Sequence, residues 1–212
     1  MFIGIYNYTV VATYLALASG VLGTVLASRG NIFWAVICLV ISGTLDMFDG
    51  RIASTKTDRT KGEKLFGIQI DSLCDLVSFG ILPAMIGVAA GMTRWYHIII
   101  VIAYVLCAQI RLAYFNVDEM LRQKKTDEKR KFYAGMPVTT VALLLPIQYA
   151  IFAPFGPGAV KVGFILFLAI SAILFILGIK IPKADRKLSL AMLIVGAVAV
   201  ICLIFFKIFH VI

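Results

Sequence analysis

Paired cysteines, an early basic segment and a normal share of charged residues are all missing from this chain of 212 residues. Its four cysteines, Cys38, Cys74, Cys107 and Cys202, lie singly in apolar segments without a C-x-x-C pair. They are therefore predicted to be small buried hydrophobes rather than disulfides or zinc ligands. The first basic residue is Arg29, so no cleavable signal peptide is expected. Charged residues make up only 15% of the chain and hydrophobic residues 61%, which excludes an ordinary soluble domain.

Long apolar segments fill the chain instead. About 20 mainly apolar residues span a bilayer, and we predict seven such segments. Residues 1–212 are therefore expected to form a single all-α, polytopic transmembrane helical bundle. The fifth segment is the weakest, because Pro137 shortens it and Pro146 interrupts it. The predicted segments are residues 8–28, 32–52, 65–90, 95–115, 136–155, 159–179 and 188–209, with polar loops at 53–64 and 116–133.

The distribution of basic residues predicts an orientation. The net charge is +9, and fifteen of the twenty Lys and Arg lie in the loops that follow the second, fourth and sixth segments, counting Arg51 at the edge of the first of these loops. This pattern favours a membrane surface, and no nucleic-acid partner is expected. Because basic loops stay in the cytoplasm, we predict a cytoplasmic-membrane protein with its amino terminus inside and its carboxyl terminus outside.

Four aspartates, Asp46, Asp49, Asp71 and Asp75, interrupt the apolar segments within residues 45–79. A charged side chain inside a membrane segment costs about 2.5–3.5 kcal/mol, so positive charge must compensate this cluster. The spacings of three and four residues put each pair on one helix face, near the loop that joins the two segments. Carboxylates are hard oxygen ligands, and no His or Cys joins them. The pattern therefore predicts Mg²⁺, Mn²⁺ or Ca²⁺ at the cytoplasmic face, and two adjacent cations are reasonable.

Small residues accompany the aspartates. Gly50 follows Asp49, and Gly67 lies one turn before Asp71. A residue without Cβ lets a phosphate approach the backbone, but it also lets two helices pack closely, and both interpretations stay open. The hydroxyl of Ser78 is suited either to a phosphate or to a helix carbonyl.

Other polar residues are candidates for binding an acceptor. Arg111 is the one basic residue well inside an apolar segment, so it is predicted to bind a carboxylate or phosphate, with snorkelling as the alternative. Asn116 either orients the same ligand or caps the helix end. Lys131 and Tyr133, at the end of the basic loop, are candidates for the acceptor entrance; the alternative is a solvated loop that contacts anionic lipid.

The combined spacing resembles a known signature. D-x-x-D-G-x-x-A at residues 46–53, followed by G-x-x-x-D-x-x-x-D at residues 67–75, is similar to the pattern of the CDP-alcohol phosphotransferases (class I CDP-alcohol phosphatidyltransferases). These integral membrane enzymes move a phosphoalcohol from a CDP-linked donor to an acceptor hydroxyl. The runs FGIQIDSLCDLVSFGILPA, RLAYFN and FYAGMP look like the phosphatidylserine synthase branch, and the resemblance covers about residues 40–145.

The resemblance implies a fold and an activity. A six-helix family core with one added helix would transfer the phosphatidyl group of CDP-diacylglycerol to the hydroxyl of L-serine, giving phosphatidylserine and CMP. The four aspartates would hold two divalent ions, Mg²⁺ or Mn²⁺, and Asp75 would also be the general base. Membrane lipids and a second copy of the chain, in a homodimer, are implied partners. The implied donor-binding residues are Gly50, Ala53, Ser54, Gly67 and Ser78, and the acceptor-binding residues are Arg111, Asn116, Lys131 and Tyr133.

One position departs from the family pattern. The pattern has arginine directly after the alanine, where this chain has Ser54, and the loop that follows is longer than usual. Lys56, Arg59, Lys61 or Lys64 is expected to supply the missing positive charge; if none does, donor binding is weaker.

Two alternative functions stay open. The same fold is compatible with glycerol 3-phosphate or an inositol phosphate as acceptor, although a phosphorylated acceptor needs a further basic pocket that the helices do not offer. The carboxylates are also compatible with a cation transporter. Their position at one membrane face argues against a transporter, because transporter sites usually lie near the midplane.

Overall fold

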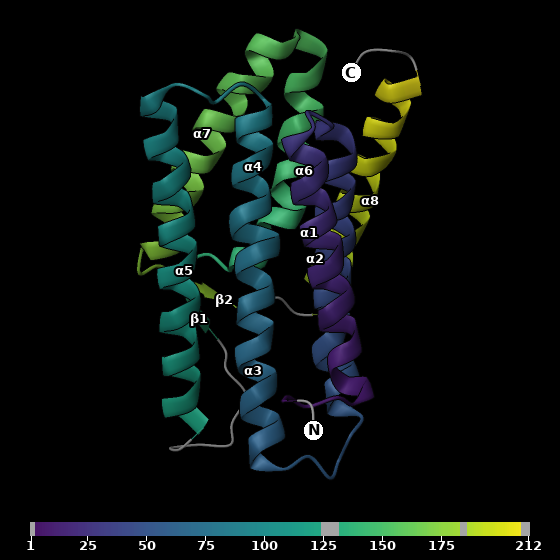
Figure 1. The fold of residues 1–212 in the computed structure, drawn as a ribbon, viewed down its shortest axis with the longest axis vertical. Coiled ribbons are helices and arrows are strands. Elements are labelled where there is room, and N and C mark those ends of the chain that lie inside the picture. Colours follow the sequence, from purple (N-terminus) through teal and green to yellow (C-terminus); the bar gives the residue numbers. More distant parts are fainter. Residues whose placement is uncertain (1–2, 124–131, 183–185, 209–212) are drawn as a thin grey trace.

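The computed structural model describes residues 3–123, 132–182 and 186–208. Its helices run side by side along the long axis of the molecule, and two three-residue strands form a small antiparallel pair (Figure 1). The helices are α1 (Val11–Ser28), α2 (Ile32–Ser54), α3 (Lys61–Asp75), α4 (Leu82–Ala89), α5 (Trp95–Gln123), α6 (Val141–Phe152), α7 (Pro157–Ile176) and α8 (Arg186–Ile208), and the strands are β1 (Phe132–Ala134) and β2 (Lys180–Pro182). Short 3₁₀ turns precede α1 (Tyr8–Val10) and flank α6 (Val138–Thr140 and Ala153–Phe155).

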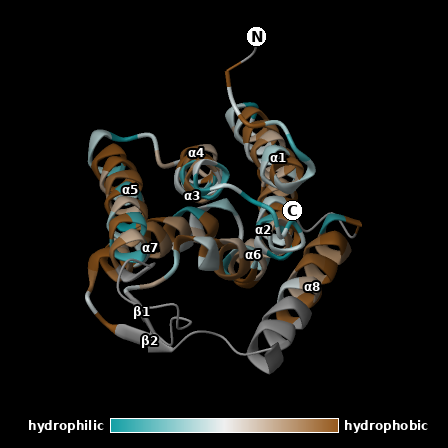
Figure 2. Ribbon diagram, turned by 90° about the horizontal axis from the view of Figure 1, so that it is seen from below, coloured by the Kyte–Doolittle hydropathy of each residue, from teal (hydrophilic) through white to brown (hydrophobic). Residues whose placement is uncertain are grey.

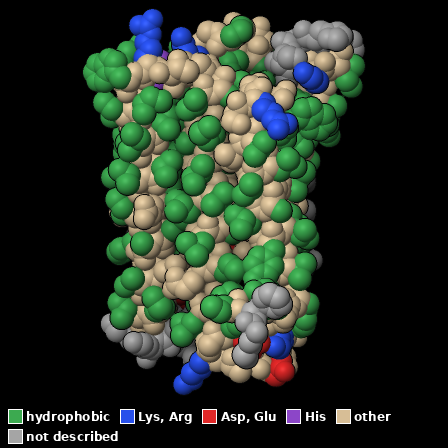
Figure 3. Space-filling model, viewed as in Figure 1, with side chains coloured by type: hydrophobic (Ala, Val, Ile, Leu, Met, Phe, Trp, Pro, Cys, Tyr) green, Lys and Arg blue, Asp and Glu red, His purple; other side chains and the backbone are tan. Residues whose placement is uncertain are grey.

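The bundle has the dimensions and surface of a membrane protein. Within the described residues, six helical spans are long and apolar enough to cross a membrane, and Val195–Ile208 in α8 is a shorter apolar helix. Apolar side chains cover the middle of the molecule, and Lys and Arg lie at its two ends (Figure 3). The predicted all-α polytopic bundle is therefore confirmed. The six spans are Tyr8–Ser28, Ile32–Ser54, Lys61–Ala89, Trp95–Leu121, Val138–Phe155 and Pro157–Ile176.

The predicted loop at 53–64 was too long. α2 continues to Ser54, and α3 begins at Lys61. Thr60 starts α3 with a capping box: its hydroxyl accepts from the Glu63 amide at 3.1 Å, and Glu63 accepts from the Thr60 amide at 2.7 Å. The T-x-x-E pattern was a start signal for a helix that our interpretation missed.

The predicted loop at 116–133 was also wrong in its first part. α5 continues to Gln123, eight residues beyond the predicted end of the fourth segment. Residues 116–123 lack apolar periodicity, but Glu, Met, Leu, Arg and Gln are strong helix formers and extend a helix that has already begun.

The third span contains a π-helical turn. The turn, Leu76–Ile81, directly follows the last residue of α3. Tyr104 of α5 donates a hydrogen bond to the Phe79 carbonyl at 2.6 Å, deep in the bundle. On the other side, a Cβ on Gly20 of α1 would lie 2.5 Å from the Ser78 hydroxyl oxygen, so only glycine permits this approach. α1 and α5 thus hold the end of α3 in place.

Hydroxyl groups join α1 to α2. Ser42 of α2 donates to the Ala16 carbonyl at 3.0 Å, and Ser19 of α1 donates to the Cys38 carbonyl at 2.9 Å. Such interhelical bonds replace water as partners inside a membrane. The amino terminus and the α2–α3 loop lie at one end of the bundle, and the carboxyl terminus lies at the other (Figure 1).

Candidate metal and phosphate site

The aspartates of α2 and α3 converge. Asp46, Asp49 and Asp71 offer carboxylate oxygens that all lie within 4.8 Å of one another. Asp46 and Asp49 are one turn apart near the end of α2, and Asp71 faces them from α3. The predicted meeting of the two helix faces is therefore confirmed for these three residues.

Asp75 lies deeper, with 7% of its surface exposed. It is close enough to Asp46 and Asp71 to interact with both electrostatically. Its Oδ1 atom is buried and has no hydrogen-bond partner among the described residues. A buried carboxylate oxygen without a donor is costly, so this atom is suited to a cation or to a ligand hydroxyl.

The donor set fits a hard divalent cation. The converging atoms are all carboxylate oxygens, which Mg²⁺ and Mn²⁺ prefer. The nearest cysteine, Cys74, instead directs its thiol to the Thr13 carbonyl, 3.4 Å away. Like-charged carboxylates at this spacing repel, and a bound cation removes that repulsion.

Thr13 of α1 orients the cluster, and our sequence interpretation missed it. Its hydroxyl donates to Oδ2 of Asp49 at 3.0 Å, while its side chain is 5% exposed. A hydroxyl inside the first apolar segment was the available signal, but nothing in the sequence connected it to Asp49.

A small cavity of about 170 Å³ lies on one side of the cluster. It brings together Gly50, Ala53 and Gly67, three of the predicted donor-binding residues. Gly50 has open space beside it: a Cβ added there would have no atom within 4 Å from other parts of the described chain. Thr9, Val10, Thr13, Asp49, Arg59, Lys64, Ile68 and Asp71 complete the lining.

A larger cavity of about 960 Å³ lies on the other side and shares Asp49 and Gly50 with the first. Its walls come from α2, the end of α3, α5, the turn Val138–Thr140, α6 and α8. α8 packs beside α6 and α2, as the view from the amino-terminal end of the bundle shows (Figure 2). The cavity wall is mostly apolar. The charged lining residues are Asp46, Asp49, Arg51, Asp75 and Arg111.

Of the predicted acceptor-binding residues, Arg111 lines this larger cavity and Asn116 does not. Arg111 lines it, is 6% exposed, and has its guanidinium 5.2 Å from the centre of the Phe115 ring. Asn116 lies inside α5, so the helix-capping interpretation was wrong; its side-chain oxygen accepts from Ser72 of α3 at 3.0 Å. Lys131 lies outside the described residues, as does the side chain of Tyr133, whose backbone belongs to β1.

Two predicted donor-binding serines point elsewhere. Ser54 is exposed, donates to the Arg51 carbonyl at 2.7 Å, and lines neither cavity. Ser78 is fully buried against Gly20 and also lines neither cavity. Their assignment as donor ligands stays a prediction.

Comparison with known proteins agrees with the motif. The model of the family described as CDP-alcohol phosphatidyltransferase matches residues 6–204 of this chain. That match covers both aspartate pairs and every residue that lines the two cavities.

Individual relatives cover less of the chain. A CDP-diacylglycerol–serine O-phosphatidyltransferase of Saccharomyces cerevisiae is 36% identical over 115 residues, 53% of this chain and 40% of that protein. One from Mycobacterium tuberculosis is 27% identical over 176 residues, 81% of this chain and 59% of that protein. An archaetidylserine synthase of Methanothermobacter thermautotrophicus is 31% identical over 133 residues, 62% of this chain and 53% of that protein. The chain thus spans 40–59% of the length of these curated relatives.

Proposed function

The chain belongs to the CDP-alcohol phosphatidyltransferase family, and from this premise we propose that it transfers the phosphatidyl group of CDP-diacylglycerol to the hydroxyl of L-serine, giving phosphatidylserine and CMP. The observation that carries the proposal is the convergence of the aspartates between two cavities. The names of the three relatives all include serine, which supports serine as the acceptor. Family membership leaves the cation-transporter alternative without support.

We propose that Asp46, Asp49, Asp71 and Asp75 hold two divalent cations, Mg²⁺ or Mn²⁺. When bound, these ions would neutralise charge on the donor diphosphate. The clustered carboxylate oxygens and the unpartnered Oδ1 of Asp75 support this assignment.

The two cavities suit the two ends of the donor. Gly50, which has open space beside it, lets the diphosphate approach the backbone of α2 in the small cavity, and Gly67 lines the same cavity from α3. The apolar wall of the large cavity, with Val40, Leu143 and Val200, suits the acyl chains, since burying them there continues the bilayer interior. The reacting phosphorus then lies between the cavities, next to the aspartates.

Arg111 and Asp75 are the residues proposed to act on the acceptor serine, and both line the large cavity. Arg111 binds the carboxylate of serine bidentately. Asp75 accepts the proton of the serine hydroxyl as its oxygen attacks the phosphorus that bears the diacylglycerol. The new bond joins serine oxygen to this phosphorus, the bond to the bridging oxygen breaks, and CMP leaves with that oxygen.

A CMP-release assay tests the proposal. We expect the purified protein to release CMP only when CDP-diacylglycerol, L-serine and Mg²⁺ or Mn²⁺ are all present, and chelation to stop it. Asp75→Asn should lower turnover by about 100- to 10,000-fold, because an amide cannot accept the proton. Asp58→Asn, in the exposed α2–α3 loop, is the matched control and should keep full turnover.

Three outcomes contradict parts of the proposal. Full turnover by Asp75→Asn would show that Asp75 is not the general base. Faster CMP release with glycerol 3-phosphate or an inositol phosphate than with L-serine would make the phosphorylated alcohol the acceptor. Arg51, which also lines the large cavity, would then be the second basic group beside Arg111. Cation flux into liposomes that contain no CDP-lipid would support the transporter hypothesis.

A further inference from the structure

The position after Ala53 cannot supply a cation to the donor. The family pattern has arginine there, whereas this chain has Ser54. The Ser54 hydroxyl is bonded to the Arg51 carbonyl, and the side chain is exposed outside both cavities. A donor diphosphate in the small cavity therefore needs positive charge from another part of the chain.

Arg59, in the α2–α3 loop, lies over the small cavity. Its Nη2 atom is 2.7 Å from the point where a Cβ on Gly67 would lie, so the absent side chain of Gly67 makes room for the guanidinium. Arg59 lines the cavity together with Asp49 and Asp71. A phosphate bound to cations on these aspartates would therefore lie within reach of the guanidinium.

The guanidinium has donors left for a ligand. Its Nε is buried and has no hydrogen-bond partner among the described residues. Nη2 makes one long bond, 3.3 Å, to the Glu63 carbonyl. An arginine carries five N–H donors in a planar fork that matches phosphate oxygens, so most of this capacity is unused.

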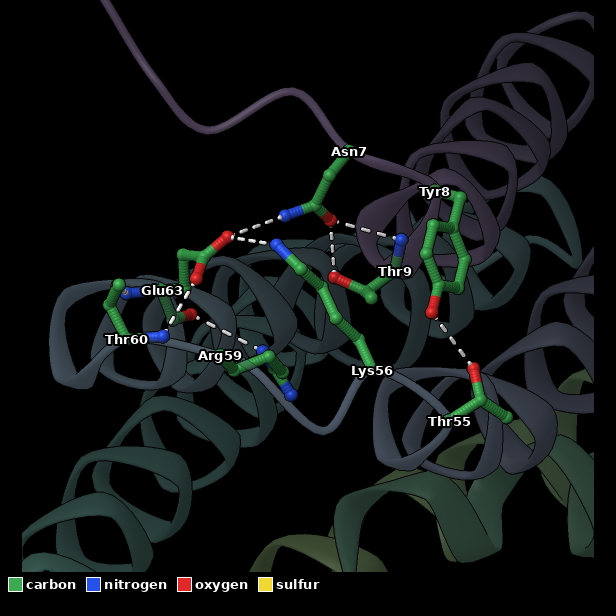
Figure 4. Close-up of polar contacts among 8 residues, drawn as sticks. All are labelled: Asn7, Tyr8, Thr9, Thr55, Lys56, Arg59, Thr60 and Glu63. Atoms are coloured by element: carbon green, nitrogen blue, oxygen red, sulfur yellow. Dashed lines mark hydrogen bonds and ion pairs between the residues drawn. The ribbon is translucent and has the colours of Figure 1, made fainter.

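The loop around Arg59 is fixed by polar contacts (Figure 4). The Glu63 carboxylate accepts from Lys56 at 2.6 Å, from Asn7 at 3.1 Å and from the Thr60 amide at 2.7 Å. These bonds tie the loop both to the start of α3 and to the chain before α1. Arg59 is therefore preorganised, which lowers the entropy cost of ligand binding.

The other basic residues of this region are less suited to the role. Lys56 is paired with Glu63, and that hydrogen bond raises the pKa of Lys56. Lys61 lines neither cavity. Lys64 lines the small cavity but presents a point charge without the planar fork.

We infer that Arg59 binds the diphosphate of the CDP-linked donor from the α2–α3 loop, in place of the arginine that the family pattern has after the alanine. This inference rests on the proposed function. The greater length of the α2–α3 loop is then explained, because it places the Arg59 guanidinium next to Gly67.

Binding of CDP and steady-state kinetics test the inference in the full-length protein. Arg59→Ala should weaken CDP binding at saturating Mn²⁺, and raise the KM for CDP-diacylglycerol, by about 10- to 100-fold, the range for a lost charge-assisted bond. Arg59→Lys should fall between Arg59→Ala and wild type. The KM for L-serine should not change. Lys61→Ala removes the same charge two residues away and should match wild type.

The possible contrary results distinguish a failure of the Arg59 inference from a failure of the proposed function. Wild-type CDP affinity in Arg59→Ala overturns the inference while leaving the proposed function intact. A parallel rise of the serine KM also overturns it, because the role is then structural. Tighter Mn²⁺ binding by Arg59→Ala without nucleotide, with unchanged CDP affinity, would make Arg59 a counter-ion of the aspartates instead. A wild-type protein that binds no CDP and releases no CMP ends both proposals.

Discussion

Single hydroxyl groups from other helices orient the polar residues of the site. Thr13 of α1 donates to Asp49, and Ser72 of α3 donates to Asn116 of α5. A carboxylate held in this way keeps its direction without a bound cation. Residues that contact metal ligands commonly affect metal affinity by about 10- to 100-fold.

Thr13→Val tests this orienting role. Valine keeps the branched shape but removes the donor to Asp49, so Mn²⁺ affinity and CMP release should both fall, by about 10-fold or more. Thr24→Val is the control, since Thr24 lies on the same helix and bonds only locally to the Gly20 carbonyl. Titration with Mn²⁺ gives the affinity without turnover. Equal Mn²⁺ affinity in Thr13→Val and wild type would show that Asp49 needs no such support.

The site residues that the sequence predicted make contacts that follow from local spacing, whereas those that it missed make contacts between residues far apart in the chain. Asp46 and Asp49, or Asp71 and Asp75, share a face by local helical periodicity, and one loop brings the two faces together. The bond from Thr13 to Asp49 joins residues 36 positions apart. No local pattern contains that pairing. Arg59 could be proposed only as one of four basic residues until the loop conformation was known.

At the scale of elements, the third span was predicted as one continuous segment at 65–90 but contains the π-helical turn Leu76–Ile81. Hydropathy is the same for an α-helix and a π-helical turn, so the sequence pattern cannot separate them. The start of α3 depended on a capping box, and the short β1–β2 pair on tertiary packing. Composition alone predicts neither.

Tyr104 is predicted to stabilise the π-helical turn. Tyr104→Phe leaves the buried Phe79 carbonyl without this donor, which should lower stability by about 1–3 kcal/mol. Because Asp75 directly precedes the turn, CMP release should also fall. Thermal unfolding in detergent and the CMP assay measure the two effects.

The control lies on the same helix. Tyr96→Phe removes a hydroxyl from a partly exposed ring at the start of α5, far along the helix from the turn, and should change neither quantity. Equal melting temperatures for Tyr104→Phe and wild type would mean that the Phe79 carbonyl finds another donor at no cost.

For the molecule as a whole, the order of six of the seven predicted spans was predictable because spanning a bilayer is a matter of apolar length. The seventh predicted segment, residues 188–209, contains only the shorter apolar helix Val195–Ile208 among the described residues. The described helices also place the two termini at opposite ends, as the predicted orientation requires (Figure 1). The homodimer implied by the resemblance stays a prediction. So does the side of the membrane that the aspartates face, which decides where the soluble substrate arrives.

Cysteine labelling tests the orientation. In an active variant whose four native cysteines are replaced by alanine, Asp58→Cys places a thiol in the α2–α3 loop, and Asn31→Cys places one in the turn at the opposite end; both positions are exposed. The basic loops predict a cytoplasmic α2–α3 loop. A membrane-impermeant maleimide should therefore label Asn31→Cys in intact cells, and Asp58→Cys only in inverted vesicles. Labelling of Asp58→Cys in intact cells would place the aspartates outside, away from cytoplasmic serine, and would contradict the proposed orientation without affecting the proposed chemistry.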